Sequence, residues 1–493
     1  MANKKEEKVK IDIDIKVRNI GPINKGNVSF TPLTIFVGPN SAGKTMLAHL
    51  LNIFPGSQKS WIDQLTFFFS QSMKEILSHE IKKTFLKNSR NFAQNIIKNL
   101  DNNISITLSK VETNKLFKYI FSKNENSIFK LQNFLELFKS YYSVGNLSEL
   151  ITYGENSGRI SITVDIFNIH FNFNQAGNVK YSVSGKVKNI EFSKADIKEP
   201  KADIIEDSLL KIVYPKTMEA ENILLFLIEW ISNRFRKKVL LKRVYSLPAI
   251  RSGLMQVYPP LINAYIKIIP RLKLTWLEIP SLPGATIDLL SQLTSFSSKI
   301  EKGYFMNIAK EMEEEMLHGS VNLEKISEKL PPKLSFEEKN HTLNINRVSS
   351  SISEMIPFII YLKYILKKGD ILIIDEPESH LHPRNQAVLA KYLVKLVNNG
   401  LNIVITTHSD FIINKLNNLV MKEQKTESDL SLSPAKINLY LLEQTKSNFF
   451  NTKEISISDD GIKLEEFQKI REELYEEEVK LFYKKEQKRR KMQ

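Results

Sequence analysis

One segment near the N-terminus has the residue types and spacing that bind a phosphate chain. It consists of Gly38, Pro39, Asn40, Ser41, Ala42, Gly43, Lys44 and Thr45. The glycines allow a tight loop whose backbone N–H groups point inward around a phosphate. Lys44 would reach the β- and γ-phosphates, and the Thr45 hydroxyl would ligate Mg²⁺. An ordinary glycine-rich turn does not explain a Lys-Thr pair at this place, so we predict a nucleotide-binding loop.

An acidic pair follows an apolar run much later in the chain. The run Ile371–Ile374 predicts a central strand, and Asp375 and Glu376 would lie at its carboxyl end. Asp375 suits the Mg²⁺ shell, directly or through water. Glu376 can orient and deprotonate an attacking water, which is the role of a general base. Paired acids after a strand are also common as solvated loop residues, but the phosphate-binding loop in the same chain favours the functional interpretation.

A histidine follows the next apolar strand. The helix Arg384–Val397 separates the acidic strand from Ile403–Thr406, which predicts a β-α-β unit in a parallel sheet. His408 would therefore emerge beside the acidic pair, where a γ-phosphate sensor would lie. His380 and His382 have the spacing of a metal-binding pair, but the sequence offers no further ligands near them, so we expect no metal site there.

The order of these motifs resembles that of ABC-type, AAA-family ATPases. More narrowly, it resembles the overcoming-lysogenisation-defect (OLD) family and its stand-alone ATPase relatives. The similar segments are Asp375–Pro383, Thr406–Ser409, Arg18–Ile23 and Leu247–Gly253. They lie within residues 11–56 and 240–415. The resemblance implies binding and Mg²⁺-dependent hydrolysis of ATP, with Lys44, Glu376 and His408 as the catalytic residues.

The family also has a signature segment before the acidic strand, and Val348–Glu354 takes that place here. The resemblance implies that this segment of one subunit contacts the γ-phosphate held by another, through Ser349 and Ser350. It therefore implies a homodimer that forms on ATP binding. Ser351 departs from the glycine that is usual there, which limits close approach of the backbone to phosphate.

The same serines have a plain structural interpretation. Ser351 and Glu354 have the spacing of a capping box that would open a helix over Met355–Leu366. The family's metal-sensing glutamine has no assigned counterpart, although Arg251 and Gln256 lie in the segment where it is expected.

The spacing of the motifs predicts a head that is assembled from two parts of the chain. Lys44 and Asp375 lie 331 residues apart (375 − 44), and the resemblance implies that a transporter ATPase subunit has far fewer residues between these motifs. We predict an α/β fold: a P-loop ABC-type ATPase head with a mixed sheet, an antiparallel β lobe and a large, mainly helical insertion. The predicted domains are the head (1–56 and 341–443), the inserted region (57–340, with 240–253 returning to the head) and a charged tail (444–493).

Smaller patterns predict the elements inside these regions. Alternation of apolar and polar residues predicts an antiparallel meander over 160–192 and a hairpin of Lys333–Glu337 with Thr342–Val348. Other predicted strands are Ile11–Val17, Leu33–Val37, Ile104–Leu108, Val239–Tyr245 and Ala435–Leu442. The remaining predicted helices are Met46–Phe54, Ser208–Phe235, Asp288–Leu317 and Lys463–Lys491.

Composition limits the classes of protein. The 493 residues include no cysteine, which excludes disulfides, thiolate catalysis and cysteine-ligated metals. A charged N-terminal segment and the lack of a long apolar run predict a cytoplasmic protein without a membrane-spanning helix. The net charge of +15 favours contact with DNA or RNA, but a lysine-rich bias of the whole chain explains it equally well. The densest basic cluster comprises Arg234, Arg236, Lys237, Lys238, Lys242 and Arg243.

Two classes of function remain. The first is an ATPase that regulates a separate effector protein, such as a nuclease or toxin, or that acts on nucleic acid, in anti-phage defence or DNA repair. The second is the energising ATPase subunit of a membrane transporter. The long insertion and the unusual signature favour the first. Because only 85 residues (493 − 408) follow His408, we expect no fused nuclease of the OLD type.

Overall fold

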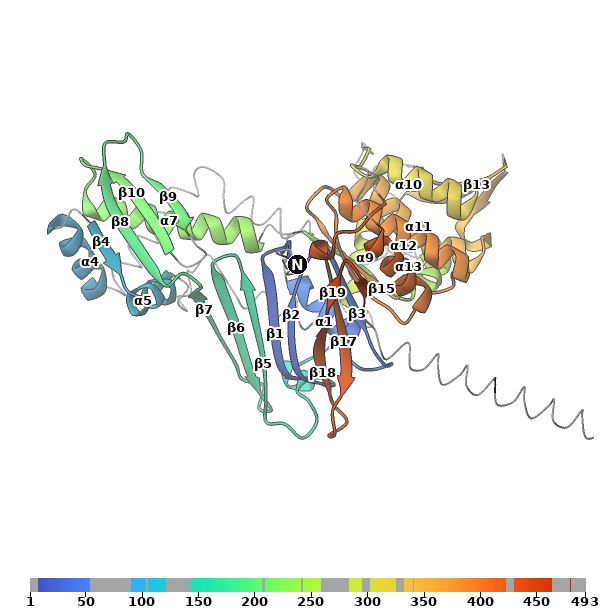
Figure 1. The fold of residues 1–493 in the computed structure, drawn as a ribbon, viewed down its shortest axis with the longest axis horizontal. Helices are drawn as coiled ribbons and strands as arrows, with labels where there is room; N and C mark the ends of the chain where they lie inside the picture. The colour runs from blue at the N-terminus through green and yellow to red at the C-terminus, as the bar shows by residue number, and fades with distance from the viewer. Residues whose placement is uncertain are drawn as a thin grey trace, which may run out of the picture.

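The computed structural model is an elongated molecule in which a long, twisted sheet joins two lobes (Figure 1). One lobe consists mainly of helices and lies at the end of the sheet that contains the acidic strand, Ile371–Asp375. The other lobe contains a second, smaller sheet. The structure describes residues 8–53, 90–102, 105–120, 139, 142, 144–205, 209–240, 243–258, 283–294, 302–324, 332–339, 341–422, 430–462 and 479. No helix in this described part of the chain is both long and apolar enough to cross a membrane.

The main sheet has eleven strands and is mixed, as the sequence predicts. Its spatial order is β11 (Val244–Leu247), β15 (Ile371–Asp375), β16 (Asn402–Thr406), β3 (Leu33–Val37), β17 (Ile437–Gln444), β18 (Phe450–Ile455), β2 (Ile23–Ser29), β1 (Ile13–Ile20), β5 (Ser157–Val164), β6 (Phe167–Asn174) and β7 (Val179–Gly185). The first five strands are parallel. Their apolar runs are buried on both faces, which is typical of parallel strands that are covered by helices.

The meander predicted over 160–192 is present from β5 to β7 and continues the sheet of the head, but its last part, Asn189–Ala195, is a strand of the second sheet. β5 pairs antiparallel with β1, with Val17 opposite Ile160, and β6 and β7 follow as successive hairpins. β1 alternates buried and exposed residues, so its free edge needs a partner with the same period, which β5 supplies. A strand from the predicted tail, β18, likewise lies inside the sheet, between β17 and β2. The boundaries of the domains remain a prediction.

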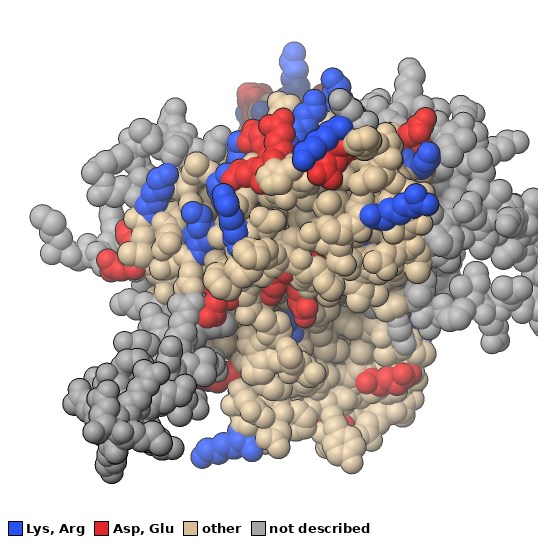
Figure 2. Space-filling view, turned by 90° about the vertical axis from the view of Figure 1, so that its right-hand side faces the viewer, with Lys and Arg blue, Asp and Glu red and all other residues tan. Residues whose placement is uncertain are grey.

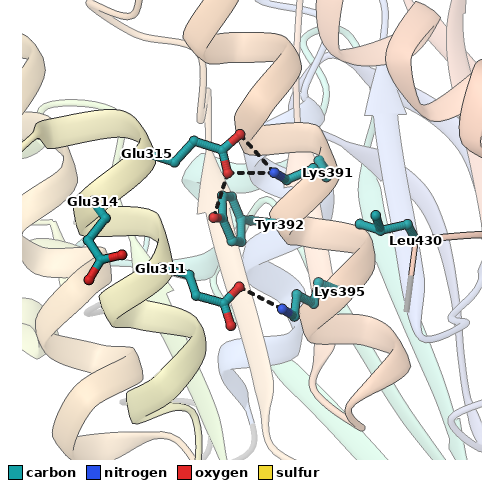
Figure 3. A pocket seen from close by; sticks show the side chains of 7 residues that line it. All are labelled: Glu311, Glu314, Glu315, Lys391, Tyr392, Lys395 and Leu430. Atoms are coloured by element: carbon teal, nitrogen blue, oxygen red, sulfur yellow. Dashed lines mark hydrogen bonds and ion pairs between the residues drawn. The ribbon is translucent and has the colours of Figure 1, made fainter. Parts of the chain in front are cut away.

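Helices pack around the parallel end of the sheet. They are α1 (Lys44–His49), α9 (Gly284–Thr294), α10 (Met306–Met312), α11 (Ser350–Ile360), α12 (Pro383–Asn398) and α13 (Asp410–Met421). A π-helical turn at Glu313–Leu317 extends α10, and another at Tyr361–Ile365 extends α11. Ion pairs join the first of these segments to α12: the distance from the lysine Nζ to the carboxylate is 2.7 Å for Lys391–Glu315 and 2.6 Å for Lys395–Glu311 (Figure 3).

The second sheet has the order β4 (Ser105–Leu108), β8 (Asn189–Ala195), β10 (Leu209–Pro215) and β9 (Lys201–Ile205). Nearby in the same lobe lie α4 (Arg90–Asn102), α5 (Lys110–Ile120) and α7 (Ala220–Phe235) (Figure 1). The helix predicted over 208–235 is therefore wrong in its first part. Leu210, Ile212 and Tyr214 are buried alternately, which is the period of a strand, and the helix begins only at Ala220.

Other predicted boundaries also differ from the structure, and one predicted helix cannot be compared with it. The strand predicted from Val239 begins at Val244, because α7 continues as a π-helical turn over Arg236–Leu240. In the predicted hairpin, β13 (Lys333–Glu338) pairs with β14 (His341–Asn344), and a 3₁₀ turn ends the second strand early; β12 (Ser320–Glu324) completes this sheet. The charged helix predicted over 463–491 lies outside the described residues, apart from residue 479.

Candidate active site

The predicted phosphate-binding loop connects β3 to α1 and has the backbone that such a loop needs. Gly38, Ser41 and Gly43 have positive φ angles of 141°, 59° and 95°. A Cβ atom on Gly38 would lie 2.9 Å from the carbonyl oxygen of Leu442, and one on Gly43 would lie 2.9 Å from the side chain of Ile23. Glycine is therefore required at both positions, and the resulting curved backbone fits a phosphate group.

The Lys44 side chain folds back over this loop. Its ammonium group donates to the carbonyl oxygens of Gly38, at 3.0 Å, and Pro39, at 2.7 Å. Burial lowers the pKa of Lys44, while the nearby carboxylates of Glu376, Glu378 and Asp375 oppose this shift. A cation that is held over a curved backbone by neutral carbonyls can transfer its hydrogen bonds to phosphate oxygens.

Asp375 ends β15 and is buried next to Thr45. The Thr406 hydroxyl donates to Asp375 Oδ1 at 2.9 Å, and the Thr45 side chain also hydrogen-bonds this carboxylate. Burial alone would raise the pKa of Asp375, but His49, Thr406 and Thr45 together lower it. An ionised carboxylate beside a threonine hydroxyl is an oxygen donor set that fits Mg²⁺. Within the described residues, no group of three or more histidines and acids could hold a metal by itself.

His49 is a residue of this site that the sequence interpretation missed. Its Nε2 atom lies 2.7 Å from Asp375 Oδ2, and the two side chains are only 8% and 4% exposed. His49 lies four residues after Thr45 in α1, so both project toward the end of β15. This spacing in the helix after the loop is the signal that could have identified it.

Glu376 follows Asp375 in a strained conformation, with a φ angle of 43°. Its backbone N–H donates to the carbonyl oxygen of Thr406 at 2.9 Å, and the Ser379 hydroxyl donates to its carboxylate at 3.4 Å. The side chain is half-buried, so water can reach it. The carboxylate acts electrostatically on both Lys44 and His408, which places the three side chains in one site.

His408 emerges after β16 beside this group, and Glu378 holds its backbone. The N–H of His408 donates to Glu378 Oε1 at 2.6 Å, and the Thr407 hydroxyl donates to the same oxygen at 2.9 Å. Partial desolvation and the charge of Lys44 lower the pKa of His408, against the effect of Glu376, which favours the neutral form of the ring. Burial raises the pKa of Glu378, whose second oxygen has no hydrogen-bond partner among the described residues.

The two predicted signature serines lie at the exposed start of α11. Ser349 is the N-cap: its hydroxyl accepts from the N–H of Ile352 at 3.4 Å and lies 3.0 Å from the hydroxyl of Ser351. Ser350 is the first residue of the helix. The capping box expected at Ser351 and Glu354 is therefore wrong, because the helix begins earlier and Glu354 is buried in an ion pair.

Several other residues considered in the sequence have structural contacts. His382 caps α12, with its Nδ1 accepting from the N–H of Arg384 at 3.3 Å. In the basic cluster, Arg234 pairs with Asp165, Arg243 pairs with Asp370, and Lys237 and Lys238 are exposed. Lys242 lies outside the described residues. On the helical face of the molecule, the described basic and acidic side chains are interspersed rather than gathered in one basic patch (Figure 2).

The AAA ATPase domain family matches residues 13–413. No curated protein matches the chain significantly. Similar solved structures include a SmcHead bound to the C-winged helix domain of ScpA, with 9% identity, coverage of 90% of this chain and 97% of that one, and a TM-score of 0.41.

Two further structures are similar. One is an Smc head with an extended coiled coil bound to the C-terminal domain of ScpA, from Pyrococcus furiosus, with 11% identity, coverage of 94% and 98%, and a TM-score of 0.40. The other is an SMC head domain from Thermotoga maritima, with 10% identity, coverage of 90% and 98%, and a TM-score of 0.34. Because these TM-scores are low, the assignment rests on the family match, which spans most of the chain. The protein belongs to the AAA ATPase domain family and is an ATP-hydrolysing enzyme.

Proposed function

We propose that this ATPase hydrolyses ATP with Mg²⁺ in a closed dimer of two heads. The observation that carries the proposal is the meeting of Lys44, Asp375, Glu376 and His408 at the carboxyl ends of neighbouring parallel strands. The carboxyl edge of a parallel sheet is where such folds bind ligands. The exposed serines of α11 are part of the same proposal, because a second head would bring them to the γ-phosphate.

Each side chain has a role that its surroundings support. Lys44 would exchange the two carbonyl oxygens that it now contacts for β- and γ-phosphate oxygens. Thr45 and Asp375 would hold Mg²⁺, which would neutralise developing phosphate charge. Glu376 would orient the attacking water and take its proton, and the neutral ring of His408 would contact the γ-phosphate as a sensor.

We further propose that the head regulates a separate effector protein, such as a nuclease or toxin, or acts on DNA or RNA. The resemblance to stand-alone relatives of the OLD family supports this, in the setting of anti-phage defence or DNA repair. A second observation supports it: the segment between β3 and β15 adds a smaller sheet with its own helices, distant from the site (Figure 1). Such a lobe offers a surface for a partner without disturbing the chemistry.

A trapping experiment tests the chemistry and the dimer together. Glu376→Gln keeps the shape of the side chain but removes the base, so this variant should bind ATP, hydrolyse it slowly and accumulate as a dimer. Light scattering with Mg²⁺ and ATP measures the mass, and Lys44→Ala, which should stay monomeric, is the control. Normal hydrolysis by the glutamine variant would show that Glu376 is not the base. A monomeric glutamine variant with bound ATP would show that the dimer is wrong.

A further inference from the structure

Arg251 is a buried arginine that hydrogen-bonds the backbone at Glu376, the proposed general base. Arg251 begins the helical segment after β11 and is 2% exposed. One of its terminal nitrogens, Nη1, donates to the carbonyl oxygens of Pro248 at 2.9 Å and Asp375 at 2.6 Å. The other, Nη2, donates to the carbonyl oxygen of Glu376 at 3.1 Å. The planar guanidinium thus spans two successive carbonyls at the end of the acidic strand.

A carboxylate on the signature helix fixes this arginine. Arg251 Nη2 lies 2.6 Å from Glu354 Oε1, and the side chains are 3% and 0% exposed. The other oxygen of Glu354 accepts from the N–H of Ser252 at 2.9 Å. Glu354 lies little more than one turn after the N-cap Ser349, so the contact joins the start of α11 to the acidic strand.

These hydrogen bonds from Arg251 matter because Glu376 has a backbone conformation that is unfavourable for any residue other than glycine. Its φ angle is 43°, and such conformations persist only where the surroundings enforce them. Thr406 enforces it from one side by accepting the N–H of Glu376. Arg251 stabilises the same conformation by donating to the carbonyl oxygens of Asp375 and Glu376, which lie on either side of the Glu376 Cα atom. Without Arg251 the peptide can rotate, and the carboxylate rotates with it.

We propose that Arg251 and Glu354 form a positioning pair that holds Glu376 in its catalytic orientation and links it to the signature helix. The inference rests on the proposed role of Glu376 as the base. Neither member of the pair needs to touch ATP. Through this pair, a movement of α11 at the signature serines changes the orientation of the base in the same head.

The alternative is that the pair only stabilises the fold, and a second buried pair provides a matched control. Lys363, in the π-helical turn that extends α11, lies 2.6 Å from Glu313, and their side chains are 6% and 3% exposed. Lys363 also donates to the carbonyl oxygen of Val321 at 2.8 Å, and Val321 belongs to β12, in a different sheet from the acidic strand. Replacing either pair with methionines removes both charges and keeps the volume, which folds commonly tolerate.

The experiment compares R251M/E354M with K363M/E313M and the parent. It measures kcat, the Kd of a fluorescent ATP analogue, and Tm. We expect kcat to fall by about tenfold to a hundredfold in R251M/E354M, because small misplacements of a catalytic group have effects of that size. The Kd should stay within about threefold, because Lys44 and the phosphate loop are intact. The control pair should change Tm by a similar amount without lowering kcat.

Three outcomes would overturn the inference. They are a parent-like kcat in R251M/E354M, an equal loss of kcat and ATP affinity in that variant, and an equal loss of kcat in the control. If R251M/E354M does not fold, Arg251→Lys decides instead. Lysine keeps the charge next to Glu354 but cannot span both carbonyls, so kcat should still fall at unchanged Kd, and a parent-like kcat would refute the role. The Glu376→Gln variant tests separately whether Glu376 is the base. Normal hydrolysis by that variant would refute the role of Glu376, whatever the result for Arg251 and Glu354.

Discussion

Replacing His49 with leucine would leave one oxygen of a buried carboxylate without its partner. The His49 Nε2 atom lies 2.7 Å from Asp375 Oδ2, and both side chains are more than nine-tenths buried, so water cannot take the place of the ring. Leucine has a similar volume, so the cost comes from the lost polar contact rather than from a cavity. Breaking such a pair costs about 3 kcal/mol of the free energy of unfolding. For a chain of this size, we expect Tm to fall by about 3–6 °C.

The same substitution should weaken Mg²⁺ binding, because His49 orients one of the two predicted ligands. Loss of a group that orients a metal ligand reduces affinity by about 10- to 100-fold. Two assays measure the effects: thermal unfolding without nucleotide, and ATPase rate against Mg²⁺ concentration at saturating ATP.

His49→Gln is the matched control for both assays. Its amide group can donate toward Asp375, so it should recover part of the stability and of the Mg²⁺ affinity. A leucine variant with the Tm and the Mg²⁺ dependence of the parent would refute the reasoning, because it would show that Asp375 does not depend on the imidazole.

Three further predictions concern other parts of the molecule. Lys44→Ala should raise the Kd for ATP by about a hundredfold or more, since no other side chain supplies a cation at the β- and γ-phosphates; equal affinities in calorimetry would refute the site. Burial raises the pKa of Glu378, so the stability of the parent relative to Glu378→Gln should fall as pH rises from the ordinary glutamate pKa of 4.5 through the folded value; a constant difference in Tm across this range would contradict it. Duplex DNA should bind weakly and lose affinity steeply with salt, and charge reversal at the exposed Lys237 and Lys238 should weaken it further; fluorescence anisotropy with no binding at low salt would discard nucleic acid as a target.

Local sequence was sufficient wherever a pattern and its chemistry lie in one short segment. The strand Leu33–Val37 has the predicted bounds, and the glycines after it have the positive φ angles that the loop needs. β15 and β16 lie side by side and parallel, as the helix between them predicts. In these segments the apolar runs set burial, and the connection between strands sets their direction, so distant contacts have little influence.

The sequence was weaker where neighbouring structure chooses between local alternatives. The segment Leu209–Pro215 has strand alternation, but the helical pattern that follows it led to one long predicted helix. The start of α11 was predicted at a capping box of Ser351 and Glu354, but Glu354 is buried in an ion pair and Ser349 caps the helix. Both choices depend on partners from elsewhere in the chain, which periodicity does not reveal.

The surroundings of the proposed catalytic side chains were decided only by the tertiary structure. His49 and Asp375 are 326 positions apart in the chain, and Arg251 reaches the carbonyl oxygen of Asp375 from 124 positions away. The spacing of Thr45 and His49 in the helix after the loop could single out His49, but neither local segment shows that His49 or Arg251 reaches Asp375. The sequence determined which side chains could perform the chemistry. The fold determined which other residues hold them, since only the packing of distant strands and helices brings those residues within hydrogen-bonding distance.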